Sequence, residues 1–175
     1  ASMWMTYEHV IRHAAGLGRV ADDHDDPDRY EKTNAHCDVL VAGGGIAGLR
    51  AALQAGRSGA RVILADEQNE FGGWLLGESD VTIDGTSAAD WIASAVAELS
   101  AMPEVTLLPR TTVFGYMDHN YLTLTERVTD HLGERPSHLP RQRMWKVRAG
   151  QTVLAQGAHE RPLVFSGNDL PGVML

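Results

Sequence analysis

The sequence predicts an α/β fold: a Rossmann-like, doubly wound parallel sheet that carries an antiparallel β-meander as an insertion. Two near-continuous apolar runs, 39–42 and 62–65, predict strands that are buried on both faces, as in a parallel sheet. Between them, glycines and a segment rich in Ala and Leu (46–55) predict a tight turn followed by a helix. Three segments rich in β-branched and aromatic residues predict the strands of the meander: 111–116, 121–128 and 143–148.

The segment before this unit predicts a helix and a linker. Tyr7, Ile11 and Ala14 follow a helical spacing, which predicts a short N-terminal helix. The aspartates that follow, around Pro27, repel one another and predict a surface linker. A calcium loop is disfavoured, because its glycine and distal glutamate are missing. The aspartates are Asp22, Asp23, Asp25, Asp26 and Asp28.

A cap and two apolar runs predict the rest of the parallel sheet. Ser87, with Asp90 three residues later, predicts the start of a second covering helix. Residues 105–108 predict a third buried strand. After a turn at 149–150, residues 152–155 predict a last strand that returns to the main sheet.

Composition and charge narrow the class of protein. Asp and Glu (23) outnumber Lys and Arg (15), and the net charge of -8 argues against a nucleic-acid partner. No apolar run approaches the roughly 20 residues of a membrane span, so no membrane partner is expected. The single cysteine, Cys37, favours a reducing cytoplasm and an inert thiol. His9 and His13 lack a third ligand, so no metal site is predicted.

The glycine pattern after the first strand predicts a dinucleotide site. Gly43, Gly45 and Gly48 have the G-x-G-x-x-G spacing between a predicted strand and a predicted helix. In such a turn the first glycine permits the bend, the second admits a pyrophosphate, and the third lets helix and strand pack closely. Asp66, at the end of the second strand, is placed to accept hydrogen bonds from a ribose. Its charge would repel a 2′-phosphate, which favours NAD or FAD over NADP, but the motif does not distinguish NAD from FAD.

Other residues near the predicted strand ends are weaker candidates for cofactor binding. Each of them has a competing structural role in a turn, a loop or local packing. They are Glu67 and Gln68 after Asp66, Gly72, Gly73 and Trp74 in the following loop, and Ala155 and Gly157 after the last strand. The predicted division of the chain is an N-terminal helix and acidic linker (1–35), a dinucleotide-binding domain (36–160) and the start of a truncated following segment (161–175).

Four longer strings make the chain similar to the alpha subunits of four-subunit sarcosine oxidases, with amine and opine oxidases as relatives. The strings are AHCDVLVAGGGIAGLRAAL, RVILADEQNEFGGWLL, TVFGYMDHNYLTLTERV and GAHERPLVFSGNDLPGVML. The resemblance implies the first half of a flavoprotein fold with two dinucleotide-binding domains, in a fragment of a longer subunit. It implies that NAD is bound in this fragment, with the flavins FAD and FMN in the beta subunit and at the alpha/beta contact. The NAD contacts it implies are Ala47, Asp66, Glu67, Gln68, Trp74 and Val113.

The resemblance also implies an activity and partners. The family enzyme is a heterotetramer with beta, gamma and delta subunits that demethylates sarcosine oxidatively to glycine, forms H2O2 and transfers one carbon to tetrahydrofolate. No residue of this chain is assigned to that chemistry, so its catalytic residues are not predicted. One alternative is the FAD-binding domain of an independent disulfide-reductase-like or opine/amine oxidoreductase. The other is a non-catalytic scaffold that holds a nucleotide for partner subunits.

Overall fold

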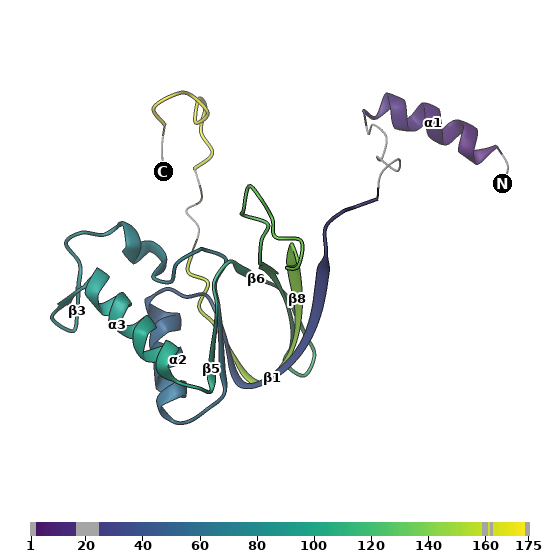
Figure 1. Cartoon of the computed structure of the whole chain (residues 1–175). Helices are drawn as coiled ribbons and strands as arrows, with labels where there is room; N and C mark the ends of the chain where they lie inside the picture. The colour runs from purple at the N-terminus through teal and green to yellow at the C-terminus, as the bar shows by residue number, and fades with distance from the viewer. Residues whose placement is uncertain (1–2, 17–24, 159–160, 162, 174–175) are drawn as a thin grey trace.

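A computed structural model describes residues 3–16, 25–158, 161 and 163–173. Its main feature is a six-stranded sheet with the order β5-β2-β1-β8-β7-β6 (Figure 1). The helices are α1 (Trp4–Ala14), α2 (Ile46–Arg57), the 3₁₀ helix η1 (Gly73–Gly77) and α3 (Ala88–Ala101). The strands are β1 (Tyr30–Ala42), β2 (Val62–Ala65), β3 (Thr82–Ile83), β4 (Thr86–Ser87), β5 (Val105–Leu108), β6 (Thr111–Met117), β7 (Tyr121–Arg127) and β8 (Gln142–Leu154).

The parallel half of the sheet confirms the predicted βαβ unit and its two covering helices. β1 pairs in parallel with β2, and β2 pairs in parallel with β5. Helices α2 and α3 bury their apolar faces against one side of these strands, in a core that includes Leu49, Leu64 and Leu99. The predicted cap of α3 is also confirmed, because the Ser87 hydroxyl accepts the backbone N–H of Asp90 at 3.2 Å.

Two strands are much longer than the sequence predicts. β8 is one continuous strand, and it replaces the two predicted strands that a turn at Ala149 and Gly150 was expected to separate. Gly150 serves close packing instead, because a Cβ there would lie 2.9 Å from the backbone oxygen of Asp38 on β1. β1 begins at Tyr30, so residues 30–35 of the predicted linker pair with β8. Figure 1 shows β1 and β8 passing from the parallel half into the meander.

The meander covers the second face of the parallel strands. β6 and β8 both pair antiparallel with β7, as predicted. Leu122, Leu124 and Val147 pack with Leu40 and Ile63 in a second core. The six strands therefore form one bent sheet with a core on each side of its parallel half.

One aspartate of the predicted linker is not a solvated surface residue. Asp28 is only 13% exposed at its side chain and forms ion pairs with Arg135 and Arg141. These arginines lie more than 100 positions further along the chain, so the local charge pattern does not reveal them. Asp25 and Asp26 are exposed as predicted, whereas Asp22 and Asp23 lie outside the described residues. Over the part of the chain that the structure describes, each helix is too short or too polar to cross a lipid bilayer.

Candidate dinucleotide-binding site

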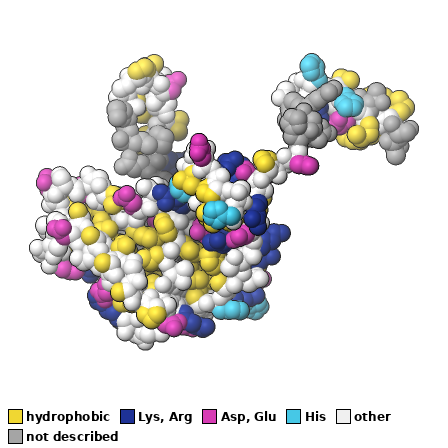
Figure 2. Space-filling view, in the orientation of Figure 1, with side chains coloured by type: hydrophobic (Ala, Val, Ile, Leu, Met, Phe, Trp, Pro, Cys, Tyr) yellow, Lys and Arg dark blue, Asp and Glu magenta, His cyan; other side chains and the backbone are white. Residues whose placement is uncertain are grey.

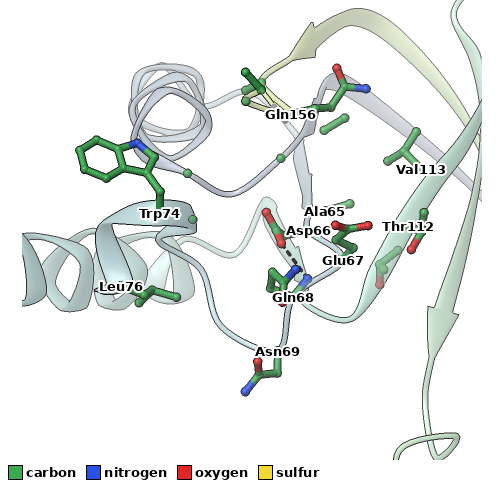
Figure 3. A pocket seen from close by; sticks show the side chains of 18 residues that line it. Ala65, Asp66, Glu67, Gln68, Asn69, Trp74, Leu76, Thr112, Val113 and Gln156 are labelled. Atoms are coloured by element: carbon green, nitrogen blue, oxygen red, sulfur yellow. Dashed lines mark hydrogen bonds between the residues drawn. The ribbon is translucent and has the colours of Figure 1, made fainter. Parts of the chain in front are cut away.

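A cavity of about 550 Å³ opens at the carboxyl ends of β1, β2 and β8. The glycine turn, η1 and the start of β6 complete its wall (Figure 3). This edge of an α/β sheet is where ligands of such folds bind. Ten of the thirteen sequence-predicted cofactor residues line it: Gly43, Gly45, Asp66, Glu67, Gln68, Gly73, Trp74, Val113, Ala155 and Gly157. Three candidates do not: Ala47 is exposed in the first turn of α2, Gly48 is buried behind the turn, and Gly72 is buried before η1.

Gly43 and Gly48 allow three backbone segments to touch. Gly43 has a φ of 105°, and a Cβ there would lie 2.2 Å from the backbone oxygen of Ala155 at the end of β8. A Cβ on Gly48 would lie 1.8 Å from the backbone oxygen of Gly43. These distances are far below van der Waals contact, so strand, turn and helix reach this spacing only with glycine at both positions.

Gly45 differs from the other two glycines because it faces open space. It is the N-cap of α2, and no protein atom lies within 4 Å of the position that its Cβ would occupy. The first backbone N–H bonded inside the helix is that of Leu49, which donates to Gly45 O at 2.9 Å. The N–H groups of residues 46–48 therefore have no acceptor within the helix, and they carry its positive end toward the cavity. An anionic group of a ligand fits this place.

Asp66 holds the loop together as well as lining the cavity. One carboxylate oxygen accepts the backbone N–H of Gly44 in a short hydrogen bond, and the other accepts the N–H of Gln68 at 2.8 Å (Figure 3). The sequence pattern assigned Asp66 to a ribose only and gave no role to Gly44. A Cβ on Gly44 would lie 2.3 Å from Cδ1 of Phe71. The middle glycine of the GGG run was therefore the signal that the pattern left unused.

The loop after β2 is anchored from the meander. The backbone N–H of Thr111 donates to Asp66 O, and that of Arg110 donates to Gln68 O, both at 2.7 Å. The Arg127 guanidinium donates to Glu67 O, also at 2.7 Å. These bonds use the backbone of the loop and leave the side chains of Glu67 and Gln68 exposed at the cavity.

Gly72 and Gly73 bring the loop before η1 into contact with the glycine turn at residues 43–45. The backbone N–H of Gly72 donates to Gly44 O at 2.8 Å, and a Cβ on Gly73 would lie 3.2 Å from Cα of Gly45. The side chain of Trp74, which follows, is 65% exposed and lies at one edge of the site in Figure 3. A large exposed aromatic beside a cavity provides an apolar wall for a ligand.

Several wall residues carry no sequence signal of their own. They are Ala42, Ala65, Asn69, Leu76, Thr111, Thr112, Gln156 and Ala158. Most are small or polar residues at strand ends, and they share a site only because four strand ends converge. Val113, which only the family resemblance indicated, lies in this wall beside Thr112.

Cys37 lies in the second core, and its burial predicts a pH effect on stability. The side chain is 4% exposed, and burial raises the pKa of its thiol from 9.0 to about 11. The unfolded chain therefore loses this proton first, and the stabilisation from the neutral buried thiol is lost as the pH rises above about 9. We expect the free energy of unfolding to fall between pH 8 and 11 by roughly 1–2 kcal/mol more in the wild type than in Cys37→Ala. Urea unfolding of both proteins checks this, and equal pH dependence would contradict it.

Comparison with known proteins gives a family and a fold. The family described as FAD dependent oxidoreductase matches residues 38–160. The sarcosine oxidase alpha subunit of Rhizobium meliloti (strain 1021) is 55% identical over 100% of this chain and 18% of its own length. Its counterpart from Corynebacterium sp. (strain P-1) is 53% identical over 91% of this chain and 16% of its own length. The chain thus spans less than a fifth of these relatives.

A more distant relative and two solved structures extend the comparison. An opine oxidase polypeptide of Agrobacterium tumefaciens (strain Ach5) is 32% identical over 78% of this chain and 27% of its own length. L-proline dehydrogenase from P. horikoshii matches with a TM-score of 0.60 and 24% identity, over 87% of this chain and 28% of that chain. Thioredoxin reductase from Lactococcus lactis matches with a TM-score of 0.54 and 18% identity, over 76% of this chain and 39% of that chain. At these identities the two structures support the fold alone, and they agree with the predicted Rossmann-like sheet.

Proposed function

The chain belongs to the FAD dependent oxidoreductase family, and from this premise we propose that its cavity holds the ADP part of a dinucleotide. The observation that carries the proposal is the open space at Gly45, next to the uncapped start of α2. A pyrophosphate there would accept the N–H groups of residues 46–48. Asp66 and Glu67 line the same cavity and would meet the adenosine ribose.

The dinucleotide that we propose is NAD. The support is the resemblance to sarcosine oxidase alpha subunits, at 55% identity over the whole chain. The carboxylates of Asp66 and Glu67 disfavour a 2′-phosphate and so argue against NADP. FAD is the second candidate, because the family is described as FAD dependent and FAD carries the same ADP group. Bound here, either dinucleotide would supply a ring that accepts a hydride.

For the whole polypeptide we propose the alpha subunit of a flavoenzyme complex of the sarcosine oxidase type. Such a complex would demethylate sarcosine to glycine with H2O2 formation and transfer one carbon to tetrahydrofolate. FAD and FMN would be bound with the beta subunit, and gamma and delta subunits would complete the assembly. The support is the identity to two sarcosine oxidase alpha subunits. The single cysteine agrees with a reducing cytoplasm.

Identification of the released dinucleotide tests the site and the cofactor separately. The assembled complex is denatured, and the small molecules are quantified by chromatography against the amount of this polypeptide. We expect one NAD for each polypeptide, beside the flavins of the partner subunits. FAD as the only dinucleotide would overturn NAD but keep the ADP site. Less than a tenth of an equivalent of any dinucleotide would overturn the site itself.

Replacing Asp66 by alanine is expected to weaken NAD binding by roughly 1–3 kcal/mol, through the loss of a charge-assisted hydrogen bond. The variant also removes the acceptor of the Gly44 and Gln68 N–H groups, so the melting temperature should fall as well. Equilibrium dialysis of the apoprotein with NAD measures the change. Glu70→Ala is the control, because Glu70 is exposed in the same loop but lies outside the cavity wall. Unchanged NAD affinity in Asp66→Ala would remove Asp66 from the site.

A further inference from the structure

The loop after β2 brings two neighbouring carboxylates to the cavity, and the protein engages only one of them. Asp66 is half-buried, and its carboxylate oxygens accept the backbone N–H groups of Gly44 and Gln68. Glu67 is exposed, and within the described residues its carboxylate forms neither a hydrogen bond nor an ion pair. In Figure 3 the side chain of Glu67 lies between Asp66 and Thr112 of β6. Glu67 therefore presents the uncompensated negative charge at this end of the site.

A guanidinium lies directly behind Glu67. Arg127, the last residue of β7, donates through Nη2 to the backbone oxygen of Glu67 at 2.7 Å. Among the residues that the structure describes, the Arg127 side chain makes no other hydrogen bond and no ion pair with a carboxylate. Arg141 and Arg143, in contrast, each pair with two carboxylates. Because its acceptor is a neutral amide, Arg127 keeps its full charge, and its remaining N–H groups are available to a ligand. Dark blue Lys and Arg side chains are also visible on the meander side of the molecule in Figure 2.

Backbone hydrogen bonds hold the loop in place independently of the Glu67 side chain. The carbonyl oxygens of Asp66 and Gln68 accept N–H groups from the start of the meander, both at 2.7 Å. With the bond from Arg127 to Glu67 O, all three carbonyls of residues 66–68 are tied to the meander. A substitution of the Glu67 side chain therefore changes the charge at the cavity and removes none of these contacts. Arg127 keeps its anchor behind the substituted residue.

We infer that Glu67 is the residue that excludes a 2′-phosphate from the site, and that Arg127 binds this phosphate once the Glu67 carboxylate is removed. The inference rests on the proposed ADP site, in which Asp66 meets the adenosine ribose. A phosphate on the 2′-oxygen would extend from that ribose toward the next loop residue, where the Glu67 carboxylate repels it. The charge of Asp66 acts less strongly, because two N–H groups already share it.

The chemistry of Arg127 fits the phosphate. A guanidinium binds phosphate oxygens through paired N–H donors, and an arginine near the ribose is the usual partner of a 2′-phosphate in dinucleotide sites. The Glu67 carboxylate stands in front of this guanidinium, since Glu67 lines the cavity and Arg127 does not. The choice between a 2′-hydroxyl and a 2′-phosphate therefore depends on a single side chain.

Two ligands that differ only by this phosphate test the role of Glu67. ADP-ribose and ADP-ribose 2′-phosphate are titrated calorimetrically into the assembled complex with the full-length polypeptide, after its bound dinucleotide has been released. We expect the wild type to prefer ADP-ribose, and Glu67→Ser and Glu67→Gln to reduce this preference at least about tenfold through tighter binding of the phosphorylated probe. Glu70→Ser is the matched control, because Glu70 is exposed in the same loop but does not line the cavity. An unchanged preference in both Glu67 variants, or an equal change in Glu70→Ser, would overturn the role of Glu67.

Double variants separate the charge of Arg127 from its bond to the loop. Glu67→Ser/Arg127→Gln should bind the phosphorylated probe at least about fivefold more weakly than Glu67→Ser, with ADP-ribose affected less than about twofold. Glu67→Ser/Arg127→Lys should keep most of the new affinity, because lysine retains the positive charge and a donor. If Arg127→Gln weakened both probes equally, Arg127 would only support the loop, and its assignment to the phosphate would fail. A wild type that binds neither probe would overturn the proposed ADP site, and this inference with it.

Discussion

Gly45→Ala is expected to remove most of the dinucleotide affinity while leaving the fold intact. A Cβ at residue 45 meets no protein atom within 4 Å, and the φ of -70° suits any residue. The methyl group would instead occupy the space where a pyrophosphate approaches the start of α2. A pyrophosphate held away from the backbone N–H groups of residues 46–48 should lose about 3 kcal/mol of binding free energy, which is roughly a hundredfold in Kd. Equilibrium dialysis with NAD and thermal unfolding of the apoprotein measure the two effects separately.

Gly77→Ala is the matched control for this substitution. Gly77 ends η1, has open space around its Cβ position and does not line the cavity. Both alanine variants should keep a free energy of unfolding within about 1 kcal/mol of the wild type. Only Gly45→Ala should lose NAD. Wild-type affinity in Gly45→Ala would mean that no ligand approaches the backbone there, and the proposed site would fail.

Gly43→Ala should instead destabilise the protein itself, by about 2–5 kcal/mol. The added Cβ would meet Ala155 O at 2.2 Å, and the φ of 105° strains any side chain. The turn can relieve this contact only by moving β8 away from β1, which would also open the cavity. Urea unfolding of the apoprotein measures the loss, and the dinucleotide content of the purified protein should fall in parallel.

Gly59→Ala separates backbone strain from the steric collision. Gly59 has a φ of 82° but no atom within 4 Å of its Cβ position, so alanine there is strained without colliding. A loss of about 1 kcal/mol is expected for it. If both variants lost the same amount, strain alone would explain Gly43, and the close contact between the glycine turn and β8 would have no energetic role.

The boundaries of the longest strands show where sequence patterns stopped being informative. The apolar run 62–65 located β2 because that strand is buried on both faces. The run 105–108 located β5, but its predicted burial is wrong, because β5 is an edge strand whose Thr106 is exposed. The early half of β1 alternates exposed and half-buried residues, and it was assigned to a linker because aspartates precede it. Gly150 was interpreted as a turn residue. A glycine that allows a turn and one that allows two backbones to touch look identical in a sequence, and only the pairing of β1 with β8 distinguishes them.

The sequence by itself determined the βαβ unit, its glycine turn and the capped second helix, because each depends on residues within about one helix or strand of each other. Only the tertiary structure decided how these parts combine into a site. It made Asp66 an acceptor for Gly44, 22 positions away, and brought Arg127 to Glu67 across 60 positions. The reason is physical: the register between distant strands follows from the burial of a shared core and the pairing of backbone groups, and neither is written in a local pattern.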